Sequence, residues 1–249
     1  MGSRSTNDGS EMNMARAYDK LPPMSALKNR TPSSLRTALG NRVVIADGAM
    51  GTMLQAANPS LADFQGFEGC NEILNVTRPD LVSSVHRQYF EAGVDAVETN
   101  TFGANLANLG EYGIPERIYE LAESGARIAR TVADSFSTPD APRWVLGSLG
   151  PGTKLPTLGH ATYQELRDAY ATAARGLIDG GSDALLIETT QDLLQAKAAV
   201  NGARIAIDEC DRDVVLIAQV TVETTGTMLL GSEVGAALTT LAALGVDLV

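Results

Sequence analysis

Cysteine, histidine and aromatic residues are scarce in this chain. Of 249 residues, two are cysteine, two are histidine and 5% are aromatic. The two cysteines, Cys70 and Cys210, cannot supply the set of bridges that holds a small secreted domain together. We interpret both as free thiols of a reducing cytosol. Neither histidine belongs to an H-E-x-x-H or Ser-His-Asp pattern, so the sequence does not indicate those hydrolase chemistries.

Long apolar runs and basic clusters are also missing. No apolar stretch approaches the roughly 18–20 residues of a membrane span, and no charged start with a hydrophobic core marks a secretory signal. The formal net charge is −11, and Lys and Arg form no run. This balance argues against nucleic acid and membrane surfaces as partners. We therefore expect a cytoplasmic protein that binds neither.

The remaining composition is that of a globular protein. Apolar residues make up 44% and charged residues 20%, and the length suits one large α/β domain or two small ones. Residues 1–30 are polar, and we expect them to form a flexible tail. Residues 31–249 are expected to form the folded part. It opens with a predicted helix over residues 31–41, which Thr31 would cap and Pro32 would begin.

Short apolar runs alternate with longer helical patterns along the chain. The predicted strands are residues 43–47, 96–100, 144–148, 184–189 and 214–220, with 247–249 beginning a sixth. Such continuous apolar runs are typical of parallel strands buried on both faces. The predicted helices include one that begins near Pro79, one that a Thr162–Glu165 capping box opens, and those over 114–136, 192–207 and 232–244. Three Gly-x-Asp tripeptides, at 93–95, 181–183 and 245–247, separate a helix end from a strand start. This is a repeated β-α unit with right-handed crossovers.

Polar residues at the strand ends favour one α/β fold over another. A doubly wound sheet usually carries a G-x-G-x-x-G turn after its first strand, and the turn at residues 47–52 lacks that spacing. Polar side chains instead end nearly every predicted strand, as they do at the functional face of a (β/α)8 barrel. We therefore predict a (β/α)8 TIM barrel of which the sequence holds about five and a half β-α units.

Asp47 and Glu188 are the leading candidates for substrate binding. Each ends an apolar strand, where a carboxylate at the rim of a dry cavity can hold an ammonium group. The alternative is that each caps the helix that follows it. Glu98 and Glu223 share this ambiguity, and we interpret Glu98 as structural because three polar residues follow it.

The glycine-rich turns and the histidines are weaker signals. The turns at residues 47–52 and 147–152 bring backbone N–H groups toward the strand ends, where they suit a carboxylate or a phosphate. His86 falls inside the first long helix, so we expect an ordinary surface or packing role for it. His160 follows the third strand on the functional side, and the sequence offers no partner for it.

Four segments taken together resemble the homocysteine S-methyltransferase family. They are Val44-Ile45-Ala46-Asp47-Gly48-Ala49-Met50-Gly51-Thr52, then Glu98-Thr99-Asn100-Thr101-Phe102 preceded by residues 90–95, then Gly147-Ser148-Leu149-Gly150-Pro151, and Ile187-Glu188-Thr189 with Asp192. They run in order over some four fifths of the chain. Residues 68–75 and 222–231 look most like the cobalamin-dependent branch of the family.

The resemblance implies a TIM barrel that binds homocysteine and zinc, on a longer chain with folate, cobalamin and reactivation modules. It assigns the homocysteine amino group to Asp47 and Glu188, and the homocysteine carboxylate to the backbone of Gly48 and Ala49. Asn100 lies at the matching rim of the second strand. The implied activity is methylation of a zinc-bound homocysteine thiolate to methionine, with the methyl group passing from methyltetrahydrofolate through cobalamin.

The zinc ligands implied by the resemblance have no counterpart in this sequence. In the family three cysteines at the ends of strands six and eight hold zinc, and these positions lie beyond Val249. We therefore expect residues 1–249 alone to contain no catalytic residue, to bind neither zinc nor cobalamin, and to be inactive. We also expect an open sheet edge that causes marginal stability or self-association. The alternatives are a stand-alone homocysteine methyltransferase using S-methylmethionine or betaine, a fusion to a methylenetetrahydrofolate reductase, and a non-catalytic binding protein derived from the barrel.

Overall fold

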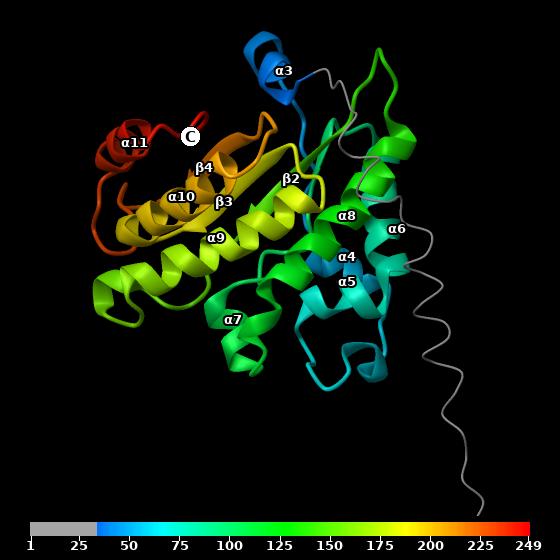
Figure 1. The fold of residues 1–249 in the computed structure, drawn as a ribbon, viewed down its shortest axis with the longest axis horizontal. Coiled ribbons are helices and arrows are strands. Elements are labelled where there is room, and N and C mark those ends of the chain that lie inside the picture. The colour runs from blue at the N-terminus through cyan, green and yellow to red at the C-terminus, as the bar shows by residue number, and fades with distance from the viewer. Residues whose placement is uncertain (1–33) are drawn as a thin grey trace, which may run out of the picture. The chain divides into compact units, whose positions relative to one another are not determined.

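A parallel sheet with helices packed on it forms the centre of the fold (Figure 1). The computed structural model describes residues 34–249, so the predicted tail over residues 1–30, together with Thr31 and Pro32, lies outside the described residues. The strands run in chain order and are β1 (Ala96–Glu98), β2 (Trp144–Leu149), β3 (Ala184–Thr190) and β4 (Val215–Val220). All neighbouring pairs are parallel, which confirms the predicted α/β class with a parallel sheet.

Single bridges extend the sheet at both edges. Ala46 pairs with Ala96, and Leu248 pairs with Ile217, both in parallel. The predicted strand at residues 43–47 is therefore reduced to one bridge. The segment lies at the edge of the sheet with a neighbour on one side only, and Val43 is 81% exposed and Ile45 58% exposed. β1 also ends earlier than predicted, because the chain turns at Thr99.

Helices occupy the connections between the strands. Their bounds are α3 (Leu35–Asn41), α4 (Gly51–Ala56), α5 (Leu74–Thr77), α6 (Pro79–Ala92), α7 (Leu106–Glu111), α8 (Ile118–Phe136), α9 (Tyr163–Asp179), α10 (Leu193–Asp208) and α11 (Val234–Ala243). Short 3-10 turns add η1 (Leu61–Phe64), η2 (Asn71–Ile73), η3 (Pro115–Arg117) and η4 (Pro156–Leu158). The predicted capping box of Thr162 and Glu165 opens α9, and the left-handed Gly93 ends α6. No helix between residues 34 and 249 is long and apolar enough to cross a membrane.

The two faces of the sheet are buried against different partners. Helices α8, α9 and α10 lie side by side on the outer face (Figure 1), where residues such as Leu185 and Leu216 enter the largest apolar cluster. The opposite, inner face carries Leu146 and Leu186, which pack with Leu35 of α3 in a second cluster. Burial on both faces explains why the strands read as continuous apolar runs.

The Gly-x-Asp repeats fasten the starts of neighbouring strands. In each repeat the aspartate N–H donates to a carbonyl of the preceding strand segment, and its carboxylate accepts the N–H of that same residue. The pairs are Asp95 with Ile45 (2.8 and 2.9 Å), Asp183 with Val145 (2.8 and 2.8 Å) and Asp247 with Leu216 (2.9 and 2.8 Å). An arginine neutralises each carboxylate: Arg42, Arg130 and Arg36 respectively. The repeat predicts a turn only. In the structure its aspartates also bond neighbouring strand segments to one another.

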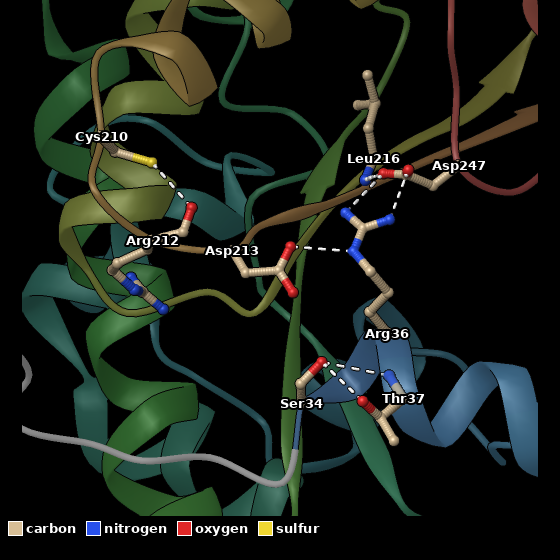
Figure 2. Close-up of polar contacts among 8 residues, drawn as sticks. All are labelled: Ser34, Arg36, Thr37, Cys210, Arg212, Asp213, Leu216 and Asp247. Carbon is tan, nitrogen blue, oxygen red and sulfur yellow. Dashed lines mark hydrogen bonds and ion pairs between the residues drawn. The ribbon is translucent and has the colours of Figure 1, made fainter.

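Arg36 ties helix α3 to the far edge of the sheet. Its Nη1 lies 2.6 Å from Asp247 Oδ1 and its Nε lies 3.0 Å from Asp213 Oδ1, just before β4 (Figure 2). Ser34 caps α3 by accepting the N–H of Thr37 at 3.2 Å. The helix is thus placed across the amino ends of the strands, and the carboxyl ends are left for the loops.

Candidate functional site

The inner face of the sheet changes from apolar to polar toward the carboxyl ends of the strands. Side chains two positions apart share a face of a strand. Glu98, Ser148 and Glu188 therefore share the inner face with the residues two positions before them, which are the buried Ala96, Leu146 and Leu186. The sheet thus presents a floor of apolar groups with polar groups above it.

A cavity of about 360 Å³ lies at these strand ends. Its lining residues are Gly48, Ala49, Met50, Gly51, Asn71, Glu72, Glu98, Thr99, Asn100, Phe102, Ser148 and Glu188. Four of the five predicted binding residues are among them. The fifth, Asp47, is not a lining residue, and it adjoins the cavity through Glu98. The volume is in the range that suits a small molecule.

Asp47 is bonded to the neighbouring strand and does not cap a helix. Its Oδ1 accepts the backbone N–H of Glu98 at 2.9 Å, whereas α4 follows Met50 without a side-chain cap. Burial raises the pKa of Asp47 to about 7 against the opposing effect of this hydrogen bond, and the charge of Glu188 adds to the rise. The carboxyl group of Asp47 thus bonds to β1 at the edge of the sheet and lies close enough to Glu188 for the two charges to interact.

Glu188 is held in place by a short hydrogen bond. Ser148 Oγ donates to its Oε1 at 2.5 Å, and the cap of α10 is Asp192, so the helix-cap alternative does not apply to Glu188. Burial raises the pKa of Glu188, while the hydroxyl groups of Ser148 and Thr189 oppose the rise. Thr189 has a left-handed backbone, with φ of 55°, where the pairing of β3 with β4 is irregular. Such strain in a β-branched residue is typical of functional sites.

Asn100 braces the wall of the cavity. Its Nδ2 donates to the carbonyl of Asn71 at 2.8 Å and to Oδ1 of Asn75 at 2.9 Å. Asn75 Nδ2 in turn donates to the carbonyl of Asn100 at 2.8 Å. These bonds fix the η2 turn, which contains Glu72, against the end of β1.

Two carboxyl groups of the cavity were not identified from the sequence. Glu98, which we interpreted as structural, lines the cavity; burial and the charges of Glu188 and Asp47 raise its pKa to about 8. Its place two positions after the buried Ala96 is the signal that could have revealed it. Glu72 lies in the 3-10 turn η2 and has no such signal. It is 8% exposed, its Oε1 accepts the N–H of Gly103 at 2.8 Å, and burial raises its pKa.

Other candidates lie away from the cavity. Glu223 is exposed. Apart from Ser148, the glycine-rich turn at 147–152 does not line the cavity. The turn packs closely against the loop after β1, because a Cβ at Gly150 would lie 2.3 Å from the carbonyl oxygen of Phe102. His86 is buried within α6, and burial lowers its pKa to about 4.

The remaining histidine and the cysteines do not form a metal site. His160 Nδ1 accepts the N–H of Leu155 at 3.3 Å. Cys70 is buried on the cavity side, where burial and the charge of Glu72 raise its pKa to about 11. Cys210 lies before β4 at the opposite end of the sheet, with its Sγ 3.6 Å from the carbonyl of Arg212 (Figure 2). Zinc prefers thiolates that converge on one point. In the described part of the chain no three His, Cys, Asp or Glu residues are placed to hold a metal ion, so these residues do not fit a zinc site.

Comparison with known proteins places the chain in a family. The family model for homocysteine S-methyltransferase matches residues 44–249. The methionine synthases of Mycobacterium tuberculosis and Mycobacterium leprae are 60% and 58% identical to the chain over 225 residues. That match covers 90% of this chain and 19% of each relative, so the chain spans about a fifth of their length.

Solved structures share the fold. The oxidised form of the homocysteine methyltransferase MmuM from Escherichia coli superimposes with a TM-score of 0.70 at 20% identity, over 85% of this chain and 73% of that chain. Its metallated form gives 0.69 at 21% identity, over 84% and 74%. The fold and the family model agree over most of the sequence. The chain belongs to the homocysteine S-methyltransferase family.

Proposed function

We propose that this chain is the homocysteine-binding part of a methionine synthase, and that Glu188 and Asp47 hold the amino group of homocysteine. The observation that carries the proposal is the cavity at the strand ends. It gathers carboxyl groups on an apolar floor, and no Lys, Arg or His of residues 34–249 lines it. A substrate that carries an ammonium group matches such a site, because a charge-assisted hydrogen bond strengthens where water is scarce.

The turn after Asp47 supports the placement of the substrate carboxylate. Gly48 and Ala49 line the cavity beside Asn71, and their backbone can approach a ligand closely. The Tyr89 hydroxyl donates to the carbonyl of Ala49 at 2.9 Å and so fixes the turn. In this proposal the backbone of Gly48 and Ala49 binds the homocysteine carboxylate, with the thiol directed away from the acids.

The methyl transfer itself is assigned to the whole protein. A free thiol is only a few per cent thiolate at pH 7, so the reaction needs a group that removes its proton. The cysteines described above do not fit that role. We therefore assign zinc, cobalamin and the methyltetrahydrofolate site to other parts of a protein in which this chain supplies about a fifth of the length, as in the relatives. The open sheet of residues 34–249 would then be part of a closed (β/α)8 barrel.

The test uses the whole protein and three methyl donors. Methyl transfer to homocysteine is expected from methyltetrahydrofolate and not from S-methylmethionine or betaine. Glu188→Ala is expected to weaken homocysteine binding roughly 10- to 100-fold, the loss of one charge-assisted hydrogen bond, without changing the zinc content. Glu223→Ala, at an exposed strand-end position, serves as the matched control. Unaltered binding in Glu188→Ala, loss of its zinc, or transfer from the other donors would refute the proposal.

A further inference from the structure

The proposed amino-group site uses Asp47 and Glu188 and leaves Glu98 without a role. Glu98 is nevertheless the last residue of β1 and points its side chain to the same inner face as Ser148. Its own backbone N–H holds Asp47, so the two carboxyl groups are fixed beside each other. A third acid at this place has to affect the charge that the site presents to a ligand.

The carboxyl groups of Asp47, Glu188 and Glu98 differ in the hydrogen bonds that they accept. Asp47 accepts from the N–H of Glu98, and Glu188 accepts from Ser148. Within residues 34–249 no hydrogen bond reaches the carboxyl group of Glu98. A donor stabilises the charged form of a carboxyl group, and burial without a donor favours the neutral form. Of these three groups, Glu98 is therefore the one that retains a proton most readily.

We propose that Glu98 is a specificity-determining residue of the site: its carboxyl group carries a proton when no cation is bound and releases that proton when the substrate ammonium group binds. The inference rests on the proposed function, because it takes the ligand to be an amino acid. One ammonium ion enters the acidic part of the site as one proton leaves to solvent, so the charge among the three acids is unchanged. The ligand carboxylate lies apart from them, at the backbone of Gly48 and Ala49 in the proposed function.

The surroundings of Glu98 contain acids and no base. Asp47 and Glu188 face it across the inner sheet, Glu72 lines the same cavity from η2, and the Tyr89 hydroxyl of α6 lies behind the turn. No lysine, arginine or histidine of residues 34–249 lines the cavity. Full ionisation of these acids would place several negative charges in one poorly hydrated volume. A proton compensates one of them until a ligand cation does so.

This exchange gives a basis for selecting amino acids over their uncharged analogues. An ammonium ion displaces the proton and gains the attraction of one more carboxylate. A 2-hydroxy acid of the same shape brings no positive charge, so Glu98 stays neutral and the acid gains nothing. Binding of the amino acid should therefore strengthen as the pH rises through the range in which Glu98 would otherwise keep its proton, and binding of the hydroxy acid should not.

Calorimetry on the whole protein tests the proposal. L-methionine is the probe, because it has the same ammonium and carboxylate groups as homocysteine and no thiol proton of its own. Titrations at pH 7.5 in two buffers of different ionisation enthalpy give the number of protons released. About one proton per methionine is expected for the unaltered protein, less than about half of one for Glu98→Gln, and about one for the control Glu223→Gln. The methionine affinity should rise by up to about tenfold per pH unit between pH 6 and pH 8, with a flatter profile in Glu98→Gln.

The outcomes separate the two proposals. Equal proton release from the unaltered protein and Glu98→Gln, or no release from the unaltered protein, would overturn the role of Glu98 while leaving amino-acid binding intact. Failure of both homocysteine and methionine to bind would overturn the proposed function itself. Should Glu98→Gln fold poorly, Glu98→Asp replaces it: it keeps the carboxyl group and should keep the release. Release that is the same for methionine and for 2-hydroxy-4-methylthiobutanoate would also contradict the exchange.

Discussion

Glu98→Gln is expected to make the folded chain more stable at pH 8 and to leave its stability nearly unchanged at pH 5. Burial and two neighbouring acids raise the pKa of Glu98 from 4.5 to about 8 in the folded chain. Between these values the folded state keeps a proton that the unfolded state has lost. The free energy of unfolding therefore falls as the pH rises from 4.5 to about 8.

The size of the effect follows from the same shift. A single group of this kind changes stability by about 1.4 kcal/mol per pH unit within its window. Over three pH units the free energy of unfolding would change by about 4 kcal/mol. Because Glu98 is only half-buried, water screens part of this change, and we expect about 2 kcal/mol. Glutamine has the same shape as glutamate and no charge, so the free energy of unfolding of Glu98→Gln does not fall in this way as the pH rises. Its advantage over the unaltered chain should grow by about 2 kcal/mol between pH 5 and pH 8.

Urea unfolding of residues 1–249 measures this difference. Trp144 is the only tryptophan and is 1% exposed in β2, so its fluorescence reports on the sheet. Glu223→Gln provides the control, since its carboxyl group is exposed and should show no such trend. A stability difference for Glu98→Gln that is the same at pH 5 and pH 8 would refute the idea that the cavity holds this acid in its neutral form.

Four further substitutions test the framework of the site, each by urea unfolding. Asp183→Ala should cost about 3 kcal/mol because it removes the buried carboxylate that pairs with the 2% exposed Arg130, which then keeps its ion pair with the more exposed Asp134. Asp95→Ala, in a more exposed pair, should cost about 1 kcal/mol, and equal costs would contradict the role of burial. Thr189→Gly should stabilise the chain by about 1 kcal/mol by relieving the left-handed backbone at 55°, and a destabilised variant would show that the threonine side chain outweighs the strain. Gly202→Ala should cost roughly 1–3 kcal/mol, because its Cβ would lie 2.5 Å from a carbonyl oxygen of α9; a neutral result would mean that α9 and α10 can separate freely.

Much of the fold could be predicted from the sequence, because the signals are local. Apolar runs of strand length, the Thr162–Glu165 capping box and the glycine of each Gly-x-Asp repeat depend on neighbouring residues only. The edge segment at residues 43–47 was predicted less well. How far a segment pairs with its neighbour depends on its position in the sheet, and the residue pattern of the segment does not reveal that position.

The site was predictable where strand ends marked it and not where distant segments met. Asp47 and Glu188 each follow an apolar run, so the pattern singled them out. The hydrogen bond from Glu98 to Asp47 joins residues 51 positions apart, and the choice between a helix cap and a sheet contact depends on that pairing. Glu72 reaches the cavity from the 3-10 turn η2, and its bond to Gly103 depends on two segments, distant in the sequence, that pack together. Such contacts follow from the tertiary structure alone.

We propose that the homocysteine amino group lies between Glu188 and Asp47. A crystal structure of the whole protein with homocysteine bound tests it most directly. We predict the amino nitrogen within hydrogen-bond distance, about 2.7–3.2 Å, of a carboxylate oxygen of Glu188, with Asp47 on its other side and the substrate carboxylate at Gly48 and Ala49. A homocysteine molecule bound elsewhere, or one in this cavity with its carboxylate facing Glu188, would contradict the account.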